Sequence, residues 1–353
     1  MSTFRRQSLV AYGAPLRETA AECPGPTGRE VLIRVARCGV CHSDLHLQDG
    51  YFELAEGKQL DVRGGRSLPF TLGHEIAGLV EQAGEDAKHA ALGEMAAVYP
   101  WIGCGQCTAC SRGDENICAA PRHLGINVDG GFATHVTVPD SRYLLPCSPL
   151  TPAQAGILMC SGVTAYAAVK RLLHKALFGP LLLLGMGGVG MMGLALARVM
   201  FKRPPLIADI DAQKREAALA VGAAGAFDPS ADGARRALFA ASDGGVFGVC
   251  DFVGSGASLA FATSVLAKGG KVVVTGLLGG TFTMPAAFFG LKAIGIEGIQ
   301  TGTLEEAREV IDLARTPDFR FPPITERPLA EAQAALDALR AGKVFGRTVL
   351  CPA

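Results

Sequence analysis

Residues 181–190 read LLLLGMGGVG, an apolar run that enters a glycine-rich turn. The turn has the spacing G-x-G-x-x-G at Gly185, Gly187 and Gly190, and residues 189–200 continue with the apolar spacing of a helix. In this context the glycines form a dinucleotide fingerprint: the first allows a tight turn, the second lets the backbone approach a pyrophosphate, and the third lets the helix pack on the strand. A glycine-rich turn that binds no ligand is the alternative interpretation.

Strands and helices alternate from about residue 160 onward, which predicts a parallel, doubly wound sheet. Asp209 ends the second of these strands, 19 positions beyond Gly190, where the fingerprint has its acidic residue. The other elements predicted in this part are strands at 205–210, 246–254 and 270–279 and helices at 212–223 and 257–268.

The apolar run belongs to a stretch of 22 uncharged residues, 176–197, which is long enough for a membrane span. Pro180 and six glycines interrupt it, so strand, turn and helix is the better interpretation. The 33 basic residues balance the 33 acidic ones, which argues against nucleic acid or an anionic membrane as a partner. We therefore expect no membrane span and no nucleic-acid partner.

The first part of the chain, to about residue 155, has short alternating strands joined by turns rich in glycine and proline. The clearest strands lie at 30–40, 74–84 and 132–139. This pattern is typical of a compact, partly open β-barrel. The tail adds helices at 304–315 and 329–342 and a final strand at 344–350.

The chain has 11 cysteines, and its N-terminus lacks the apolar core of a secretory signal. We therefore expect a cytoplasmic protein, in which structural disulfides are rare. Four cysteines have the spacing C-x2-C-x2-C-x7-C, which suits a zinc ion closed off by four thiolates and hence structural. An iron–sulfur cluster is the alternative. These four residues are Cys104, Cys107, Cys110 and Cys118.

A second candidate metal site comes from three distant segments that contain Cys41, His74 and Cys160. Each segment is a weak signal alone, because an isolated Cys160 would be read as a small buried apolar residue. Together they supply Cys, His and Cys, the ligand set of a catalytic zinc that keeps its fourth position open.

With these motifs in place, the chain resembles the zinc-dependent medium-chain alcohol dehydrogenase family, above all its bacterial and archaeal NAD-dependent members. The resemblance covers essentially the whole chain. It rests on CGVCHSDLH (38–46), LPFTLGHEIAG (68–78), CGQCTACSRGDENIC (104–118), MCSGVTAY (159–166), GMGGVG (185–190) and FGRTVL (345–350), in this order.

The resemblance implies an α/β fold with two domains. Residues 1–160 and 298–353 would form a GroES-like β-barrel catalytic domain, and residues 161–297 a Rossmann NAD-binding domain. It also implies a homo-oligomer. Only a short interval, 118–130, follows the clustered cysteines, and this is similar to the tetrameric branch of the family.

Two zinc ions per chain are implied as well. Cys41, His74 and Cys160 match the catalytic ligands, and the four clustered cysteines match the structural site. Glu75 matches a carboxylate behind the catalytic zinc that can exchange with water as a ligand, and Asp44 matches a residue that orients His74.

Ser43 and His46 match a proton relay, because an alcohol hydroxyl bound to the metal must lose its proton before hydride leaves. A surface histidine is the alternative for His46. His42 matches a basic position near the cofactor pyrophosphate, although an unperturbed histidine is mostly uncharged at neutral pH. Asp209 matches the acid that accepts hydrogen bonds from the adenosine ribose, which favours NAD over NADP.

The implied cofactor-binding residues are His42, Thr164, Gly185, Gly187, Gly188, Val189, Gly190, Asp209, Lys214 and Arg347. Among them, Val189 and Thr164 would lie beside the nicotinamide, and Arg347 would reach the pyrophosphate. The substrate pocket would include Trp101, Tyr51, Phe52 and Leu278. Core packing is the alternative for Trp101.

The sequence thus predicts an NAD-dependent enzyme that interconverts a small uncharged alcohol with an aldehyde or ketone. A polyol or sugar dehydrogenase of the same superfamily is one alternative, but such enzymes often have Glu where this chain has Cys160. A non-catalytic binding protein with this fold is another, but it would usually have lost a zinc ligand.

Overall fold

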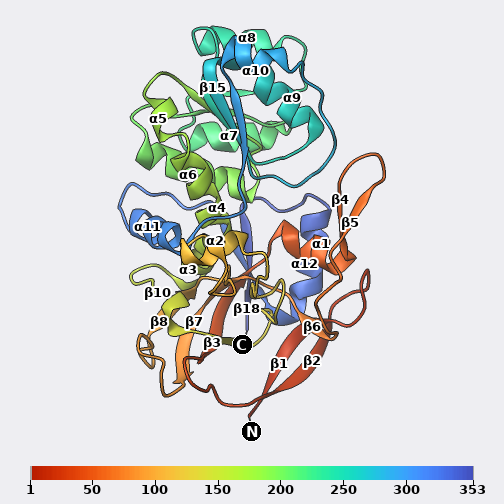
Figure 1. Ribbon diagram of the computed structural model, residues 1–353, viewed down its shortest axis with the longest axis vertical. Helices are drawn as coiled ribbons and strands as arrows, with labels where there is room; N and C mark the ends of the chain where they lie inside the picture. The colour runs from red at the N-terminus through yellow and green to blue at the C-terminus, as the bar shows by residue number, and fades with distance from the viewer. Residues whose placement is uncertain (1, 353) are drawn as a thin grey trace.

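The computed structural model describes residues 2–352 of the 353-residue chain. Two halves built on different sheets lie one above the other, and both ends of the chain lie in the lower half (Figure 1). The upper half contains the glycine-rich turn, and the lower half contains the N-terminal strands.

The sheet of the upper half is entirely parallel. Its order is β13-β12-β11-β14-β15-β16. Strands before β14 are added on one side of β11 and later strands on the other, and nucleotides bind at this switch point in such folds. The strands are β11 (Leu181–Leu184), β12 (Leu206–Ala208), β13 (Gly225–Phe227), β14 (Val246–Asp251), β15 (Leu266–Val274) and β16 (Gly295–Gly298). The helices are α6 (Gly188–Met200), α7 (Ala212–Ala220), α8 (Ala234–Ala241), α9 (Gly256–Ser264) and α10 (Ala287–Lys292).

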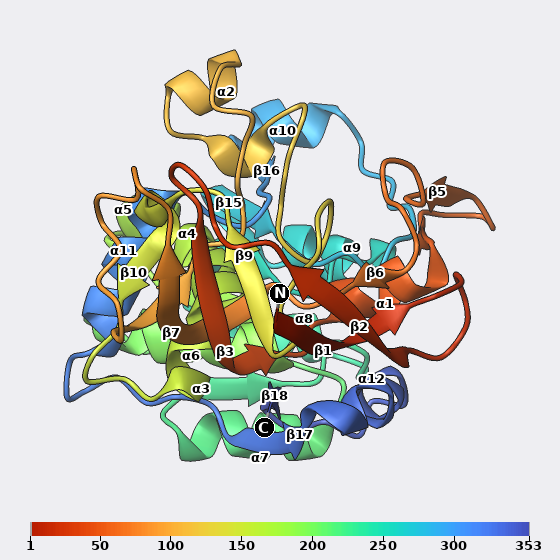
Figure 2. The same cartoon turned by 90° about the horizontal axis from the view of Figure 1, so that it is seen from below.

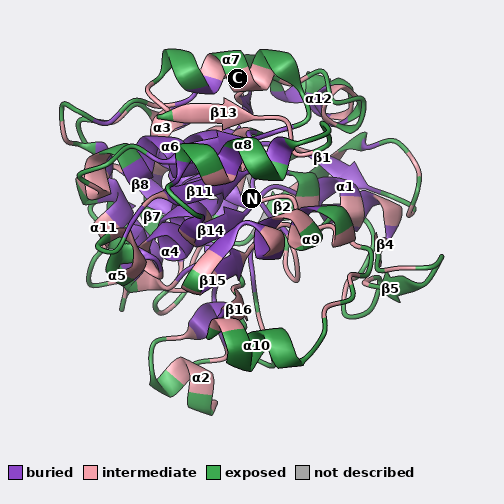
Figure 3. Cartoon of the chain, turned by 90° about the horizontal axis from the view of Figure 1, so that it is seen from above, coloured by how far each residue is buried: buried purple, intermediate pink, exposed green. Residues whose placement is uncertain are grey.

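The four leucines of β11 explain how this half is built. Successive strand residues point to opposite faces, so Leu181 and Leu183 join a core with α6, while Leu182 and Leu184 join a second core with α8 and α9. A parallel strand covered on both faces must be apolar throughout. Figure 3 shows the result, with buried strands in the centre and largely exposed helices α7 and α8 outside.

The lower half is a barrel-like assembly whose strands are antiparallel except for the pair β17–β18, and Figure 2 shows it from below. One sheet has the order β10-β8-β7-β3-β18-β17 with β9 also paired to β3, a smaller sheet has the order β2-β1-β6, and β4 pairs with β5. The strands are β1 (Ser2–Leu9), β2 (Arg17–Cys23), β3 (Val31–Gly39), β4 (Tyr51–Glu53), β5 (Gln59–Asp61), β6 (Phe70–Thr71), β7 (Glu75–Ala83), β8 (Met95–Val98), β9 (His135–Val138), β10 (Leu144–Pro146), β17 (Ile324–Pro328) and β18 (Arg347–Cys351).

Helices complete this half and connect it to the upper one. The α-helices are α1 (His42–Asp49), α2 (Thr108–Ser111), α3 (Pro152–Ile157), α4 (Val163–Lys170), α5 (Leu173–Ala176), α11 (Leu304–Ala314) and α12 (Ala332–Arg340). Short 3-10 turns are η1 (Glu115–Ile117), η2 (Ser141–Tyr143) and η4 (Leu329–Glu331), and η3 (Leu158–Gly162) is a π-helix between α3 and α4.

The fold class is confirmed, as are the strands and helices predicted above, with shifts of a few residues at their ends. The largest shift is that of the strand predicted at 270–279, which the structure places four to five residues earlier as β15. The last helix also begins later than predicted, because residues 329–331 form a 3-10 turn before α12. The sequence did not indicate η3, the β4–β5 hairpin, or the short strands β13 and β16. Among residues 2–352 no helix is long and apolar enough to cross a membrane.

Candidate active site

Four possible metal ligands from three segments meet in one buried cluster. Cys41 precedes α1, His74 and Glu75 stand at the start of β7, and Cys160 lies in η3. Their ligand atoms are within 4.8 Å of one another, and the sulfurs of Cys41 and Cys160 are 3.9 Å apart. Zinc–sulfur bonds of about 2.3 Å give a tetrahedron with edges of about 3.8 Å. Within the described chain neither Nδ1 nor Nε2 of His74 has a hydrogen-bond partner, so the donor set fits a zinc ion.

Asp44 holds the ligand segments together from the first turn of α1. Its fully buried carboxylate accepts the backbone N–H of Cys41 at 2.9 Å and that of Gly73 at 3.3 Å. Its Oδ1 also lies 3.4 Å from Nδ1 of His74. Burial opposes a charge on this imidazole, but Asp44 and Cys41 outweigh burial and raise the pKa of His74. The structure thus brings Asp44 to the ring it was predicted to orient.

The two ligand sulfurs form a coupled pair. The contact with Cys160 lowers the pKa of Cys41 well below its usual range, and the charges on His74 and Arg347 act in the same direction against burial. The same contact and burial raise the pKa of Cys160. Because the thiolate is the metal-binding form of cysteine, these contacts favour that form of Cys41.

Cys160 owes its position to an irregular helix. Residues 152–170 are helical throughout, but η3 interrupts the α-helical hydrogen bonds with a π turn. Single π turns inside α-helices are frequent at functional sites. Cys160 is 6% exposed and points from this turn toward Cys41.

Arg347 connects the ligand cluster to the glycine-rich turn. Its guanidinium, which is almost fully buried, donates to a Glu75 oxygen and, at 3.1 Å, to the carbonyl of Val40. A methyl group added at Gly188 would lie 2.7 Å from Arg347 Cδ. Arg347 is therefore next to the predicted pyrophosphate site, but its guanidinium forms an ion pair with Glu75. Burial raises the pKa of Glu75 to about 7 against the effect of Arg347.

This Glu75–Arg347 pair could not be found from the sequence, because the partners lie 272 positions apart. Gly39 gives it room. A Cβ there would lie 2.0 Å from a Glu75 oxygen that has no hydrogen-bond partner among the described residues.

The predicted relay residues lie on α1 beside the cluster. Ser43 Oγ is 3.9 Å from the sulfur of Cys41, and the His46 ring stacks on Phe52 with centroids 4.3 Å apart. Desolvation lowers the pKa of both His46 and His42. Both imidazoles are therefore neutral at pH 7, and His46 can accept a proton.

The glycine-rich turn has the geometry that its spacing predicted. Gly185 has φ +89°, and a Cβ on Gly190 would lie 1.8 Å from the carbonyl oxygen of Gly185. By contrast, the position of a Cβ on Gly187 has no heavy atom of the described chain within 4 Å. The first and third glycines are thus required by the fold, and Gly187 leaves an open approach to the N-terminus of α6.

Asp209 contacts this turn through a hydrogen bond from the backbone of Met186. It follows β12 and is 8% exposed, and its carboxylate accepts the N–H of Met186 at 2.6 Å and that of Asp211 at 2.8 Å. Lys214 lies nearby in the first turn of α7, while Thr164 and Val189 lie in the first turns of α4 and α6.

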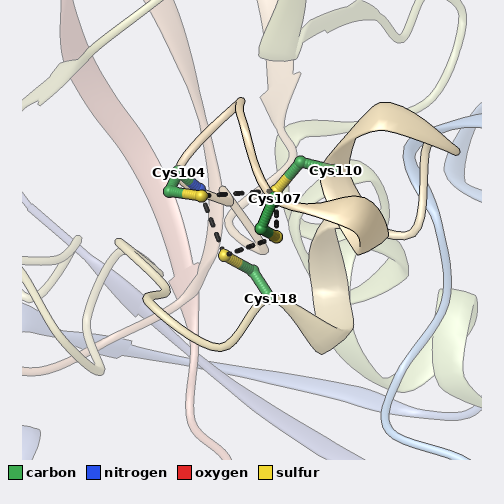
Figure 4. A group of neighbouring side chains, drawn as sticks. All are labelled: Cys104, Cys107, Cys110 and Cys118. Carbon is green, nitrogen blue, oxygen red and sulfur yellow. Dashed lines mark hydrogen bonds between the residues drawn. The ribbon is translucent and has the colours of Figure 1, made fainter.

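The four clustered cysteines form a second candidate metal site, shown in Figure 4. Their sulfurs lie within 4.8 Å of one another, with separations of 3.5, 3.7 and 4.0 Å for three pairs. These distances bracket the edge expected for tetrahedral zinc. The backbone N–H of Cys110 lowers the pKa of Cys107 to about 6, so one thiolate is ready for a metal.

Trp101, a predicted pocket residue, is only 4% exposed, and its ring packs between those of His74 and His123. No motif or spacing in the sequence indicated His123, which is also buried. Tyr51 and Phe52 lie on β4 and are partly exposed, and Leu278 is 67% exposed on the loop after β15.

Comparisons with known proteins agree with this geometry. Residues 27–149 match the alcohol dehydrogenase GroES-like domain family, and residues 188–316 match the zinc-binding dehydrogenase family. The NAD-dependent alcohol dehydrogenase of Sulfurisphaera tokodaii is 36% identical over 356 residues, which cover 99% of this chain and 100% of that protein.

Two solved structures are similar over nearly their whole length. The alcohol dehydrogenase of Aeropyrum pernix has a TM-score of 0.86 and 30% identity, covering 99% of this chain and 100% of that one. The D-arabinose dehydrogenase of Sulfolobus solfataricus has a TM-score of 0.84 and 25% identity, covering 100% of both.

A parallel sheet with a glycine-rich turn, joined to a barrel that holds a buried Cys–His–Cys set, is the architecture of a metal-dependent dehydrogenase. The chain belongs to the zinc-dependent medium-chain alcohol dehydrogenase family, and it is an oxidoreductase.

Proposed function

We propose that the protein is a zinc-dependent enzyme that transfers hydride between a primary or secondary alcohol and NAD. The observation that carries the proposal is that Cys41, His74 and Cys160 come together in one buried cluster. Glu75 in this cluster binds Arg347, which in turn lies against Gly188 of the glycine-rich turn. Three protein ligands leave a tetrahedral metal one open position for a substrate oxygen.

A zinc ion held there would supply a Lewis acid that lowers the pKa of an alcohol hydroxyl. The chain's own residues then have separate tasks. Asp44 orients His74 through Nδ1, and Glu75 stands behind the ligands with one oxygen held by Arg347. We propose that Ser43 and the neutral His46 carry the alcohol proton toward solvent, because Ser43 lies beside Cys41 and both side chains of α1 are partly exposed.

For the cofactor we propose that the turn at Gly185, Gly187, Gly188 and Gly190 binds the pyrophosphate at the N-terminus of α6. Asp209 would accept hydrogen bonds from the adenosine ribose. The remaining proposed contacts are His42, Thr164, Val189, Lys214 and Arg347. A neutral His42 would hold the pyrophosphate more weakly than an arginine.

We further propose a structural zinc in the four-cysteine lobe, and hence two zinc ions per chain. The catalytic domain would comprise residues 1–160 and 298–353, and the NAD-binding domain residues 161–297. The return of β18 to pair with β3 supports the assignment of the tail to the first domain. We also propose that the protein is a cytoplasmic homotetramer. A mass near that of two chains in light scattering would contradict the tetramer.

The proposed substrate is a small uncharged alcohol, aldehyde or ketone in a pocket formed by Trp101, Tyr51 and Phe52. A sugar or polyol is the second candidate, because the chain is similar in fold to the D-arabinose dehydrogenase of Sulfolobus solfataricus. Cys160 favours the simple alcohols.

The test is reduction of NAD⁺, followed by absorbance, across primary, secondary, cyclic and aromatic alcohols with aldose sugars included in the same panel. Metal analysis of the active protein should find two zinc ions per chain. Turnover of sugars alone would favour the second candidate. Activity that survives with one zinc or none would contradict the proposed metal chemistry.

A further inference from the structure

Trp101 contacts one of the proposed catalytic ligands directly. It is the single tryptophan of the chain and is almost fully buried. Its ring centroid lies 5.4 Å from that of His74 at an interplanar angle of 58°. On the other side the ring of His123 meets it edge-on at 5.3 Å. The indole therefore packs against the imidazole of His74 on one side and that of His123 on the other.

The same indole donates a hydrogen bond to the backbone next to a second ligand. Trp101 Nε1–H donates to the carbonyl of Met159 at 2.9 Å, in a buried contact. Met159 directly precedes Cys160 in η3. A single side chain thus reaches two of the three ligand segments.

The hydrogen bonds of η3 show why that carbonyl needs a donor. In an α-helix the N–H of Val163 would donate to Met159 O, four residues back. Here it donates to Leu158 O and Cys160 O instead, which is the π turn. Buried carbonyls are nearly always paired, so a donor is needed from outside the helix. The indole N–H of Trp101 supplies it.

We propose that Trp101 is a positioning residue for the catalytic metal site, not only a wall of the substrate pocket. Its N–H stabilises the π turn that directs Cys160 toward Cys41, and its ring fixes the imidazole plane of His74. This inference rests on the proposed function, because it assumes that both residues bind zinc. Removing the indole N–H should loosen the metal even if the pocket keeps its shape.

The test compares Trp101→Phe with Tyr99→Phe in the zinc-loaded protein. Trp101→Phe keeps an aromatic ring for packing against His74, but it removes the donor to Met159 together with one ring of the indole. Tyr99 is the matched control, since its buried hydroxyl also donates to a carbonyl, that of Gly302 at 2.7 Å, and Gly302 is not next to a ligand in the sequence. The measurement is the rate of zinc release to a chromophoric chelator, which we expect to show two phases, one for each ion. The phase that is absent from the Cys160→Ser variant belongs to the catalytic ion.

Outer residues that orient metal ligands typically change metal affinity by about 10- to 100-fold. We expect Trp101→Phe to speed catalytic zinc release by roughly tenfold or more, while Tyr99→Phe leaves this phase unchanged and neither variant alters release from the four-cysteine lobe. An unchanged phase in Trp101→Phe, or an equal effect of Tyr99→Phe, would overturn the inference.

The unmodified protein gives a second measurement. Emission from Trp101 should change in the phase that releases the catalytic zinc and stay constant while the lobe loses its ion. Emission that follows the lobe would also overturn the inference. A wild-type protein that binds no ion at Cys41, His74 and Cys160 would instead contradict the proposed function itself.

Discussion

At the scale of single residues, Asp209 is the proposed selector between NAD and NADP. Its two carboxylate oxygens each accept one backbone N–H beside the glycine-rich turn, so the charge is fixed in place. The guanidinium of Arg215 is occupied by the carbonyl of Asp209 and the carboxylate of Asp228. A 2′-phosphate would therefore meet a fixed negative charge. Two unit charges about 4 Å apart repel by roughly 4 kcal/mol at an effective dielectric constant near 20.

We expect wild type to prefer NAD by about a hundredfold or more in kcat/KM, since about 1.4 kcal/mol corresponds to a factor of ten. Asp209→Asn removes the charge but keeps an acceptor for the turn, and it should reduce this preference at least about tenfold. Asp211→Asn is the control, because Asn also caps a helix and the charge of Asp211 lies on the surface. Equal use of both cofactors by wild type would exclude Asp209 as the selector.

His46 makes the rate depend on pH in a predictable direction. Desolvation lowers the pKa of His46 from its usual value near 6.5, so the ring is a neutral proton acceptor at pH 7 and becomes protonated only in more acidic solution. Wild-type kcat should therefore fall as the pH is lowered through this pKa.

His46→Gln should reduce kcat about 10- to 100-fold at pH 7 and much less near pH 10, where solvent base can take the proton. His135→Gln is the control, because His135 pairs with Glu81 on the sheet surface. An identical pH–rate profile in His46→Gln and wild type would show that the proton leaves by another route.

At the scale of elements, the glycines of the turn between β11 and α6 have different roles. Gly185 and Gly190 are needed for the fold, and Gly187 is proposed to serve cofactor binding. Gly187 has φ −73° and no heavy atom of residues 2–352 within 4 Å of its Cβ position. Gly187→Ala should therefore fold with unchanged or slightly higher stability, by about 0.4–1 kcal/mol. Its methyl group would occupy the space where the backbone is proposed to meet the pyrophosphate. KM for NAD should rise at least about tenfold, which corresponds to a loss of about 1.4 kcal/mol in binding.

Gly64→Ala is the matched control, because its Cβ position is equally open and its φ is not in the left-handed region. It should change neither thermal stability nor KM. If Gly187→Ala binds NAD as wild type does, the pyrophosphate lies elsewhere.

The same elements show what could be predicted from the sequence. The four leucines of β11, the three glycines and the C-x2-C spacing are local patterns, because each records a constraint between near neighbours in the chain. The π turn of η3 is different. It depends on the hydrogen bond from Trp101 to Met159, 58 positions away, and the Glu75–Arg347 pair spans 272 positions. No periodicity encodes such pairs.

At the scale of the whole molecule, the two halves contact each other through backbone as well as side chains. The β4–β5 hairpin extends from the lower half toward the upper one (Figure 1). There the N–H of Gly280, on the loop after β15, donates to the carbonyl of Leu54. A Cβ on Gly279 would lie 2.5 Å from the carbonyl oxygen of Glu53 and 2.7 Å from that of Leu54. The hairpin also carries Tyr51 and Phe52, so this contact fixes one side of the proposed substrate pocket.

Gly279→Ala should release the hairpin. The residue has φ +86°, which costs an alanine about 1–2 kcal/mol, and its methyl group would meet two backbone oxygens that cannot turn away. We expect trypsin to cleave after the exposed Lys58 about tenfold faster, because a change of about 1.4 kcal/mol in the free energy of local opening corresponds to a factor of ten. We also expect KM for the alcohol to rise. Gly269→Ala is the control, since Gly269 has φ +81° but no described heavy atom within 4 Å of its Cβ position. If both variants are cleaved equally fast, backbone strain alone explains the effect, and the contact between the halves does not restrain the hairpin.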